Sequence, residues 1–349
     1  MYNSCGDRHC PQCQGGQRAA WFAARQAELL PVEYFHVVFT VPDELTPLAA
    51  ADPRCFYNLL FQAVRETLLD VAATPRHLGA RIGGQMVLHT WGQTLQLHPH
   101  VHVILPGGGL TADGQWKACP RNFFLPVKVL SRVFRGKLLA LLRQRHESDG
   151  LQWTGGLSHL ARPGALVAFF QPLYKKEWNV YAKPPTGSAE QVLKYLARYT
   201  HRVAISNRRI ESLNADGRVT FTYKDYAQGN RVQRMTLPAD EFLRRFSQHV
   251  LPRGFVRLRG FGLLANCARE RNLARCREAL GVGRVAADSA ALAGELPAEP
   301  DDATTPASES QLRCRHCGQA TLRPISNLPR PTVPELIART YSLVPLDSS

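Results

Sequence analysis

The feature that most constrains the fold of this 349-residue chain is the stretch LHPHVHVILPGGG at residues 97–109. Side chains alternate between the two faces of a strand, so His98, His100 and His102 are expected on one face and the intervening valines on the other. Packing imidazoles against a sheet costs free energy unless their nitrogens find partners, and one divalent metal ion can satisfy several of them. The glycines that follow permit close backbone approach. The pattern predicts a core strand with a metal-binding stripe; the alternative is a half-exposed strand whose histidines face water.

Hydrophobic periodicity and breaker residues predict a mixture of strands and helices along the rest of the chain. Strands are expected at 34–42, 85–91, 96–105, 178–182 and 218–226, and helices at 17–30, 56–72, 126–145, 188–201, 239–249 and 266–280.

The charge of the chain favours a polyanionic partner. The net charge is +15, although residues 285–312 contain six acidic residues and no Lys or Arg. Such an excess is typical of nucleic-acid binding, and a generically basic protein is the alternative. No run reaches the ~20 apolar residues that a membrane span requires, and the N-terminus lacks the apolar core of a signal peptide. We therefore expect a cytoplasmic protein with no membrane contact.

Five of the nine cysteines occur in tight spacings near the two ends of the chain. In a cytoplasmic protein a disulfide framework is not expected. The turns Cys10-Pro-Gln-Cys13 and Cys314-Arg-His-Cys317 are typical of zinc knuckles, in which two thiolates converge on one tetrahedral ion, and Cys5 lies close to the first of them.

The segment AEQVLKYLARYTHR at residues 189–202 predicts a helix with two tyrosines on one face. Tyr195 and Tyr199 are four residues apart, and Gln191 extends the same row. A tyrosine hydroxyl can attack a phosphodiester when a metal polarises the phosphate and cations hold it in line. Ordinary packing is the alternative for such a pair. The cations predicted to bind DNA near these tyrosines are Lys194, Arg198 and Arg202.

Several stretches together resemble one known family. They are YNSCGDRHCPQCQ, YFHVVFTVP, HTWGQTLQLHPHVHVI, VYAKPPTGSAEQVLKYLARYTHRVAISN, FTYKDY and LPRGFVRLRGFGLLAN. In this order they are similar to the two-tyrosine rolling-circle transposases of the HUH endonuclease superfamily, of the type founded on insertion sequence ninety-one. His-hydrophobic-His alone is a weak motif, but the set covers most of residues 1–280 and is specific. The resemblance implies an α+β fold with a central antiparallel sheet flanked by helices, and small zinc-binding elements at both ends.

The resemblance also implies roles for individual residues. His100 and His102 correspond to the HUH pair, which holds Mg²⁺ or Mn²⁺, and Tyr195 and Tyr199 correspond to the paired nucleophiles. A third ligand usually completes the metal site in this superfamily. We rank Gln93 slightly before Gln191, and His98 and His36 remain open.

The implied function is the nicking and rejoining of single-stranded DNA at the ends of an insertion sequence, through a 5′-phosphotyrosine intermediate and without ATP. The partners are single-stranded DNA at the transposon ends and target DNA, in a bacterial cytoplasm and near the nucleoid, and a homo-oligomer is left open. The alternatives are a non-catalytic zinc-containing DNA-binding protein left by a decayed transposase, or a related replication initiator or relaxase. A small-substrate metalloenzyme would leave the basic charge and the tyrosine pair unexplained.

The motifs divide the chain into five parts. We expect an N-terminal zinc-binding element and helix at 1–30, the HUH catalytic domain at 31–250 and a basic DNA-binding segment at 251–284. A disordered linker at 285–312 and a C-terminal zinc knuckle with tail at 313–349 follow. In the basic segment, Arg257 and Arg259 are predicted DNA contacts.

The N-terminus departs from the family pattern. Family members commonly carry further Cys or His ligands upstream of YNSC, so the zinc-binding region is expected to be shortened here. Cys5, Cys10 and Cys13 would then bind Zn²⁺ together with His9 or a residue from elsewhere in the chain.

Overall fold

The structure is a computed structural model that describes residues 22–148, 151, 155–162, 164–183, 204–226 and 228–282. The chain divides into compact units at 1–293 and 294–349, and the second unit lies wholly outside the described residues. The predicted helix at 188–201, the acidic linker at 285–312 and all the predicted zinc ligands also lie outside them.

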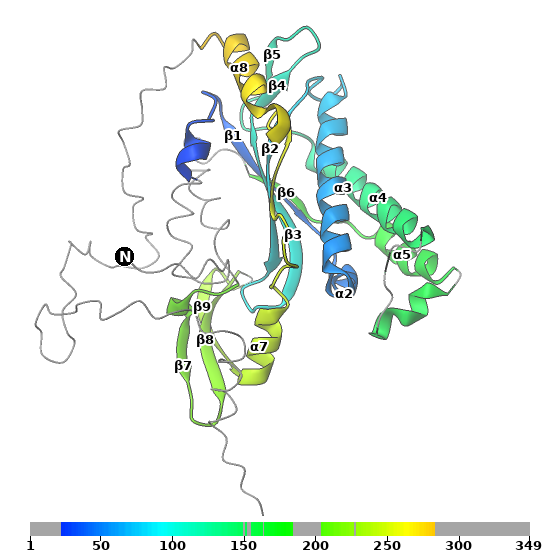
Figure 1. Cartoon of the computed structure of the whole chain (residues 1–349), viewed down its shortest axis with the longest axis vertical. Helices are drawn as coiled ribbons and strands as arrows, with labels where there is room; N and C mark the ends of the chain where they lie inside the picture. The colour runs from blue at the N-terminus through cyan, green and yellow to red at the C-terminus, as the bar shows by residue number, and fades with distance from the viewer. Residues whose placement is uncertain are drawn as a thin grey trace, which may run out of the picture. The chain divides into compact units, whose positions relative to one another are not determined.

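A five-stranded sheet forms the centre of the first unit (Figure 1). Every neighbouring pair is antiparallel, and β3 is the middle strand. The expected α+β class with a central antiparallel sheet is therefore confirmed. In spatial order the strands are β10 (Leu258–Gly262), β2 (Gly83–Trp91), β3 (Leu97–Pro106), β1 (Tyr34–Thr40) and β6 (Val180–Lys183).

Helices cover one face of this sheet, which we call the helix face. Figure 1 shows α3, α4 and α5 together on that side. The alternation of β1 and β3 supplies Phe39, Val101 and Val103, all fully buried, to a core shared with Phe134 of α4. Burying such side chains dominates the free energy of folding. The covering helices are α2 (Thr46–Ala51), α3 (Pro53–Ala73), α4 (Val127–Glu147) and α5 (Ala165–Lys175).

The starts of the two long helices follow from local sequence. Asp52 caps α3 by accepting a hydrogen bond from the Cys55 amide at 3.0 Å, and Pro53 occupies the first turn, where a missing N–H costs nothing. Pro126 is the N-cap residue of α4 and lies immediately before its first turn. The helices predicted at 56–72 and 126–145 are thus confirmed with slightly longer bounds.

A second, three-stranded antiparallel sheet is formed by β7 (Ile210–Leu213), β8 (Arg218–Asp225) and β9 (Arg231–Pro238). It is followed by α7 (Ala239–Ser247), and the two pack around Phe221 and Phe242 together with Leu95 from the β2–β3 connection. This small core therefore ties the second sheet to one end of the central hairpin.

The glycines after the histidine strand allow the close backbone approach that the sequence predicts. A Cβ atom on Gly109 would lie 2.4 Å from the Arg81 carbonyl oxygen, so no other residue fits without movement. Here β4 (Gly108–Leu110) turns back to pair with β5 (Trp116–Ala118).

After β10 the chain forms the short turn η4 (Asn266–Ala268) and then α8 (Arg269–Ala279). The helix predicted at 266–280 is confirmed, except that its first turn is 3-10 helical. Three further 3-10 turns are η1 (Asp43–Leu45), η2 (Gly155–Ala161) and η3 (Asn207–Arg209). Among the described helices, none combines the length and the apolarity that crossing a bilayer requires.

Candidate metal centre

The face of the central sheet opposite the helices carries a cluster of imidazoles, and we call it the histidine face. His100 and His102 on β3 alternate with the buried valines of the helix face. The hairpin register sets His89 of β2 directly opposite His100. His36 of β1 lies opposite Ile104, which is on the same face of β3 as His102. Three neighbouring strands thus contribute histidines to one face.

Three of these histidines lie within reach of one metal ion. His89, His100 and His102 each offer a ring nitrogen, and these nitrogens all lie within 4.8 Å of one another. The ring centroids are 4.3 Å apart for His89 and His102 and 4.9 Å apart for His100 and His102. Imidazole nitrogens are ordinary ligands of divalent first-row metals.

The protonation of the cluster suits a metal site. Burial lowers the pKa of His100 to about 4 and the pKa of His102 well below its ordinary value, and the neighbouring histidines add to the shift of His102. Neutral imidazoles present a lone pair at neutral pH, which a ligand needs. The donor set therefore fits a divalent cation.

Hydrogen bonds to the Nδ1 atoms orient two of the rings. The Nδ1 atom of His100 is 2.7 Å from the carbonyl oxygen of His98, so it carries the proton and leaves Nε2 as the ligand atom. The Nδ1 atom of His102 is 2.7 Å from Nε2 of His36, and the two rings are stacked with centroids 5.0 Å apart. Donation from His102 to His36 would likewise leave Nε2 of His102 as the ligand atom. His36 thus acts on the site through His102.

The structure places His89, and not Gln93, beside the histidine pair as the third group. The Gln93 amide donates to the Tyr226 hydroxyl at 3.1 Å and accepts from the Lys224 backbone amide at 3.3 Å, so it links the β2–β3 connection to β8 and the turn after it. His89 was not predicted from the sequence, and the observed pairing of the strands expected at 85–91 and 96–105 brings it opposite His100. His98, another alternative, is 41% exposed and lies 3.4 Å from Asp43.

Another buried histidine, His249, stabilises the end of the β2–β3 hairpin. His249 bridges the Thr90 hydroxyl and the Leu95 carbonyl, both at 3.1 Å. Leu95 is buried with a φ of 62°, a strained conformation for a non-glycine residue that such contacts hold in place. Trp91 stacks on His89 with centroids 4.8 Å apart, which further fixes that ring.

Arg257 and Arg259, which are predicted to contact DNA, also make contacts within the protein. The Arg259 guanidinium lies 4.2 Å from the centre of the Phe61 ring and donates to Asn58 at 2.6 Å, so it packs against α3. The Arg257 carbonyl accepts from the Leu88 amide at 2.9 Å and extends the sheet. A DNA contact by either residue stays a prediction.

The other predicted site residues lie outside the described residues. They are the nucleophiles Tyr195 and Tyr199, Gln191, the cations Lys194, Arg198 and Arg202, and the zinc ligands Cys5, His9, Cys10, Cys13, Cys314 and Cys317.

Comparison with known families decides the class of protein. A family model described as "Putative transposase" matches residues 83–271, more than half of the chain, and includes the whole histidine hairpin. The chain belongs to this transposase family. A second model, described as "Transposase zinc-binding domain", matches residues 1–41 of the transposase. The resemblance to transposases of the insertion sequence ninety-one type is thereby confirmed.

Two curated relatives are also described as transposases. A protein of Sinorhizobium fredii, "Putative transposase y4qJ", is 52% identical over 282 residues, which cover 80% of this chain and 71% of that protein. The "Transposase for insertion sequence element IS801" of Pseudomonas savastanoi pv. phaseolicola is 29% identical over 280 residues, covering 80% and 66%.

Among solved structures, the transposase is similar to conjugative relaxase TrwC. A complex of TrwC with a 27-mer DNA gives a TM-score of 0.26 at 17% identity and covers 50% of this chain and 68% of that chain. A metal-free complex with OriT DNA gives 0.27 at 16% identity, covering 71% and 73%.

Proposed function

We propose that this transposase nicks and rejoins single-stranded DNA at the ends of an insertion sequence by tyrosine transesterification at a metal centre on the histidine face. The observation that carries the proposal is the convergence of His89, His100 and His102 on the central hairpin, with ligand nitrogens within 4.8 Å of one another. Family membership supplies the substrate class, since a transposase acts on DNA.

The metal site would consist of these three histidines. When bound, Mg²⁺ or Mn²⁺ would supply Lewis-acid polarisation of the scissile phosphate. The imidazoles hold their positions through backbone and side-chain hydrogen bonds, so the site is organised before DNA arrives. Burial in the sheet keeps the rings of His100 and His102 neutral.

Tyr195 and Tyr199 are the proposed nucleophiles. The phenolic oxygen attacks phosphorus, a tyrosine O–P bond forms and the P–O3′ bond breaks. The hydroxyl proton of the tyrosine is balanced by protonation of the leaving 3′ oxygen. The products are a 5′-phosphotyrosine and a free 3′-OH, so the reverse attack by another 3′-OH rejoins the strand without ATP. The second tyrosine allows two ends to be held in succession.

Basic side chains would grip the DNA around the scissile bond. Lys194, Arg198 and Arg202 are proposed to contact neighbouring phosphates, because guanidinium and ammonium groups neutralise the backbone. The cysteine turns at the two ends are proposed to bind structural Zn²⁺, which would stabilise folded elements of the chain.

The proposal is tested by trapping the covalent intermediate. The purified protein is incubated with Mg²⁺ or Mn²⁺ and labelled single-stranded oligonucleotides that cover the ends of its element, and products are separated on a denaturing gel. We expect a protein-linked 5′ end that requires metal. His100→Ala should lower its yield by more than about 100-fold, and the double variant Tyr195→Phe/Tyr199→Phe should abolish it.

Each single tyrosine variant serves as a control, because one remaining nucleophile should still form one adduct. DNA binding without any adduct under either metal would contradict the proposal and favour a non-catalytic DNA-binding protein. An adduct that survives in His100→Ala would remove the histidine cluster from the chemistry.

A further inference from the structure

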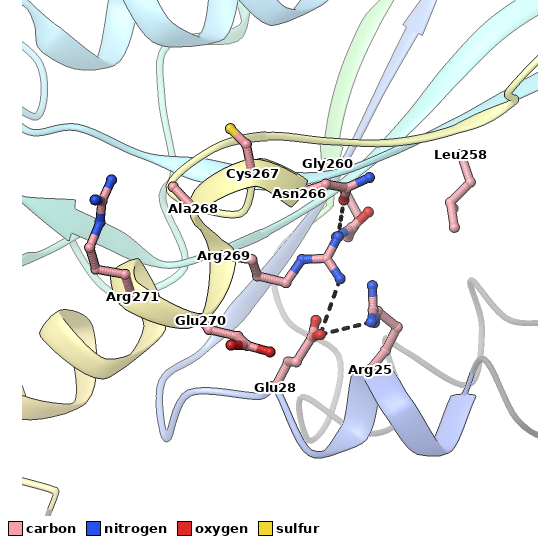
Figure 2. A pocket seen from close by; sticks show the side chains of 11 residues that line it. Arg25, Glu28, Leu258, Gly260, Asn266, Cys267, Ala268, Arg269, Glu270 and Arg271 are labelled. Atoms are coloured by element: carbon pink, nitrogen blue, oxygen red, sulfur yellow. Dashed lines mark hydrogen bonds and ion pairs between the residues drawn. The ribbon is translucent and has the colours of Figure 1, made fainter.

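A polar pocket of about 740 Å³ lies beside the metal centre in the same compact unit. Its lining comes from the helical turn at 22–26 and the residues after it, from β2 and β10, and from η4 with the start of α8. Figure 2 shows Arg25, Glu28 and Arg269 meeting at its centre, with Arg271 and Leu258 at opposite ends. The volume falls within the range of small-molecule and nucleotide sites.

Part of the pocket lining belongs to the histidine face of the sheet. Gln85 lies on the same face of β2 as His89 and four residues before it, which corresponds to about 13 Å. Gly260 of β10 is paired with Gln85 and brings no side chain to the lining. A DNA strand whose phosphate lies at the histidines could therefore place a neighbouring nucleotide in this pocket.

Two buried donors of the lining lack hydrogen-bond acceptors among the described residues. Gln85 is 7% exposed, and its Nε2 atom makes no hydrogen bond there. The Nε atom of Arg25 is also buried and makes none there. Leaving a buried donor without an acceptor destabilises the protein, so such atoms are expected to have a partner in the functional state. Because both atoms are donors, the missing partner must carry acceptor oxygens or nitrogens.

The charges at the centre of the pocket also favour an anion. One oxygen of Glu28 accepts from Arg25 at 2.7 Å and from Arg269 at 3.1 Å, so two guanidinium groups share one carboxylate. Burial lowers the pKa of Arg25, Glu28 raises it, and the nearby Arg269 lowers it. Arg271 and Glu270 are both exposed and offset each other's charge. The pocket thus retains an excess positive charge that a phosphate would neutralise.

We propose that this pocket binds one nucleotide of the single-stranded DNA substrate, with a base carbonyl accepting from Gln85 and a phosphate oxygen accepting from Arg25. The inference rests on the proposed function, because it assumes single-stranded DNA at the histidine face. It makes Gln85 a residue that recognises the base and Arg25 a residue that recognises the backbone.

The experiment compares binding of two probes to the full chain in the Tyr195→Phe/Tyr199→Phe background, where cleavage cannot interfere. The probes are dye-labelled oligo(dT), whose bases carry carbonyl oxygens, and an oligonucleotide of abasic sites with the same length. Gln85→Leu should weaken oligo(dT) binding three- to tenfold and leave binding of the abasic probe unchanged. Arg25→Gln should weaken both probes and reduce the slope of log K against log salt by about 0.7.

Gln62→Leu is the matched control, because Gln62 lies on α3 and bonds to Glu66. It should leave both affinities unchanged. Thermal unfolding without DNA gives a second readout: Gln85→Leu should keep or raise the Tm, since it removes an unsatisfied buried donor.

Wild-type affinity for oligo(dT) in Gln85→Leu would overturn the inference. A lowered Tm would do so as well, because Gln85 would then have a partner within the chain. If the parent protein binds neither probe, the proposed function itself fails, and that result is distinct from a specific effect of Gln85.

Discussion

The two faces of β3 differ in what they contribute, although they alternate residue by residue along one strand. On the helix face, Val101 and Val103 are fully buried in an apolar core. On the histidine face, His100 and His102 gather with His89 of the neighbouring strand. Because side chains alternate with a period of two, one face of β3 stabilises the fold by packing in the core while the other face presents the histidines. Substitutions on the two faces should therefore separate stability from metal binding.

The largest effect is expected on the helix face. Phe39 is fully buried and packs edge-on against Phe134, with ring centroids 5.1 Å apart. Phe39→Ala should lower the free energy of unfolding by about 3–5 kcal/mol, because it removes apolar contacts and leaves a cavity. Urea denaturation measures this change. Mn²⁺ affinity measured well below the Tm should stay the same, and a loss of affinity with unchanged stability would contradict the division of the faces.

The next largest effect is expected on the pH dependence of stability from His249, which supports the fold and is not a proposed metal ligand. Burial lowers the pKa of His249 to about 4, so between pH 6.5 and 4 the unfolded chain binds a proton that the folded chain does not. Stability therefore falls as the pH falls through this window, by about 3 kcal/mol from this residue. In His249→Gln the free energy of unfolding should lose the part of its pH dependence that comes from this residue. An identical pH slope in the variant would refute the assignment.

A smaller effect is expected from His36, whose Nε2 atom lies 2.7 Å from Nδ1 of His102. His36→Phe keeps an aromatic ring to stack but removes the hydrogen bond, so Mn²⁺ affinity should fall about 10- to 100-fold. Calorimetric titration with Mn²⁺ measures this change. His98→Ala is the control, since His98 serves His100 through its backbone carbonyl. Equal affinities for His36→Phe and wild type would show that the His36 contact does not position His102.

Much of the fold was predictable because its elements have strong local patterns. The strand at 96–105 and the helices at 56–72 and 126–145 follow from alternation, helical periodicity and proline positions, and all three are confirmed. β10 was expected only as a basic, glycine-bearing segment. Its sequence LRGFG has no clear alternation, and its pairing with β2 supplies the strand conformation.

The candidate site was predictable in part for the same reason. Alternation places His98, His100 and His102 on one face of a strand, and the resemblance selects His100 and His102 as the HUH pair. His89 stands alone in its strand, so only the pairing of β2 with β3 shows that it belongs to the cluster. His36 is further still in sequence, and its contact with His102 depends on the order of strands in the sheet.

Mn²⁺ titration of His89→Ala beside Gln93→Ala shows whether His89, His100 and His102 bind the metal together. Mn²⁺ prefers nitrogen and oxygen ligands, so the cysteine turns should not compete for it. We predict that His89→Ala weakens Mn²⁺ binding by more than about 100-fold and that Gln93→Ala binds like the wild type. Wild-type affinity in His89→Ala, with a loss in Gln93→Ala, would contradict the account.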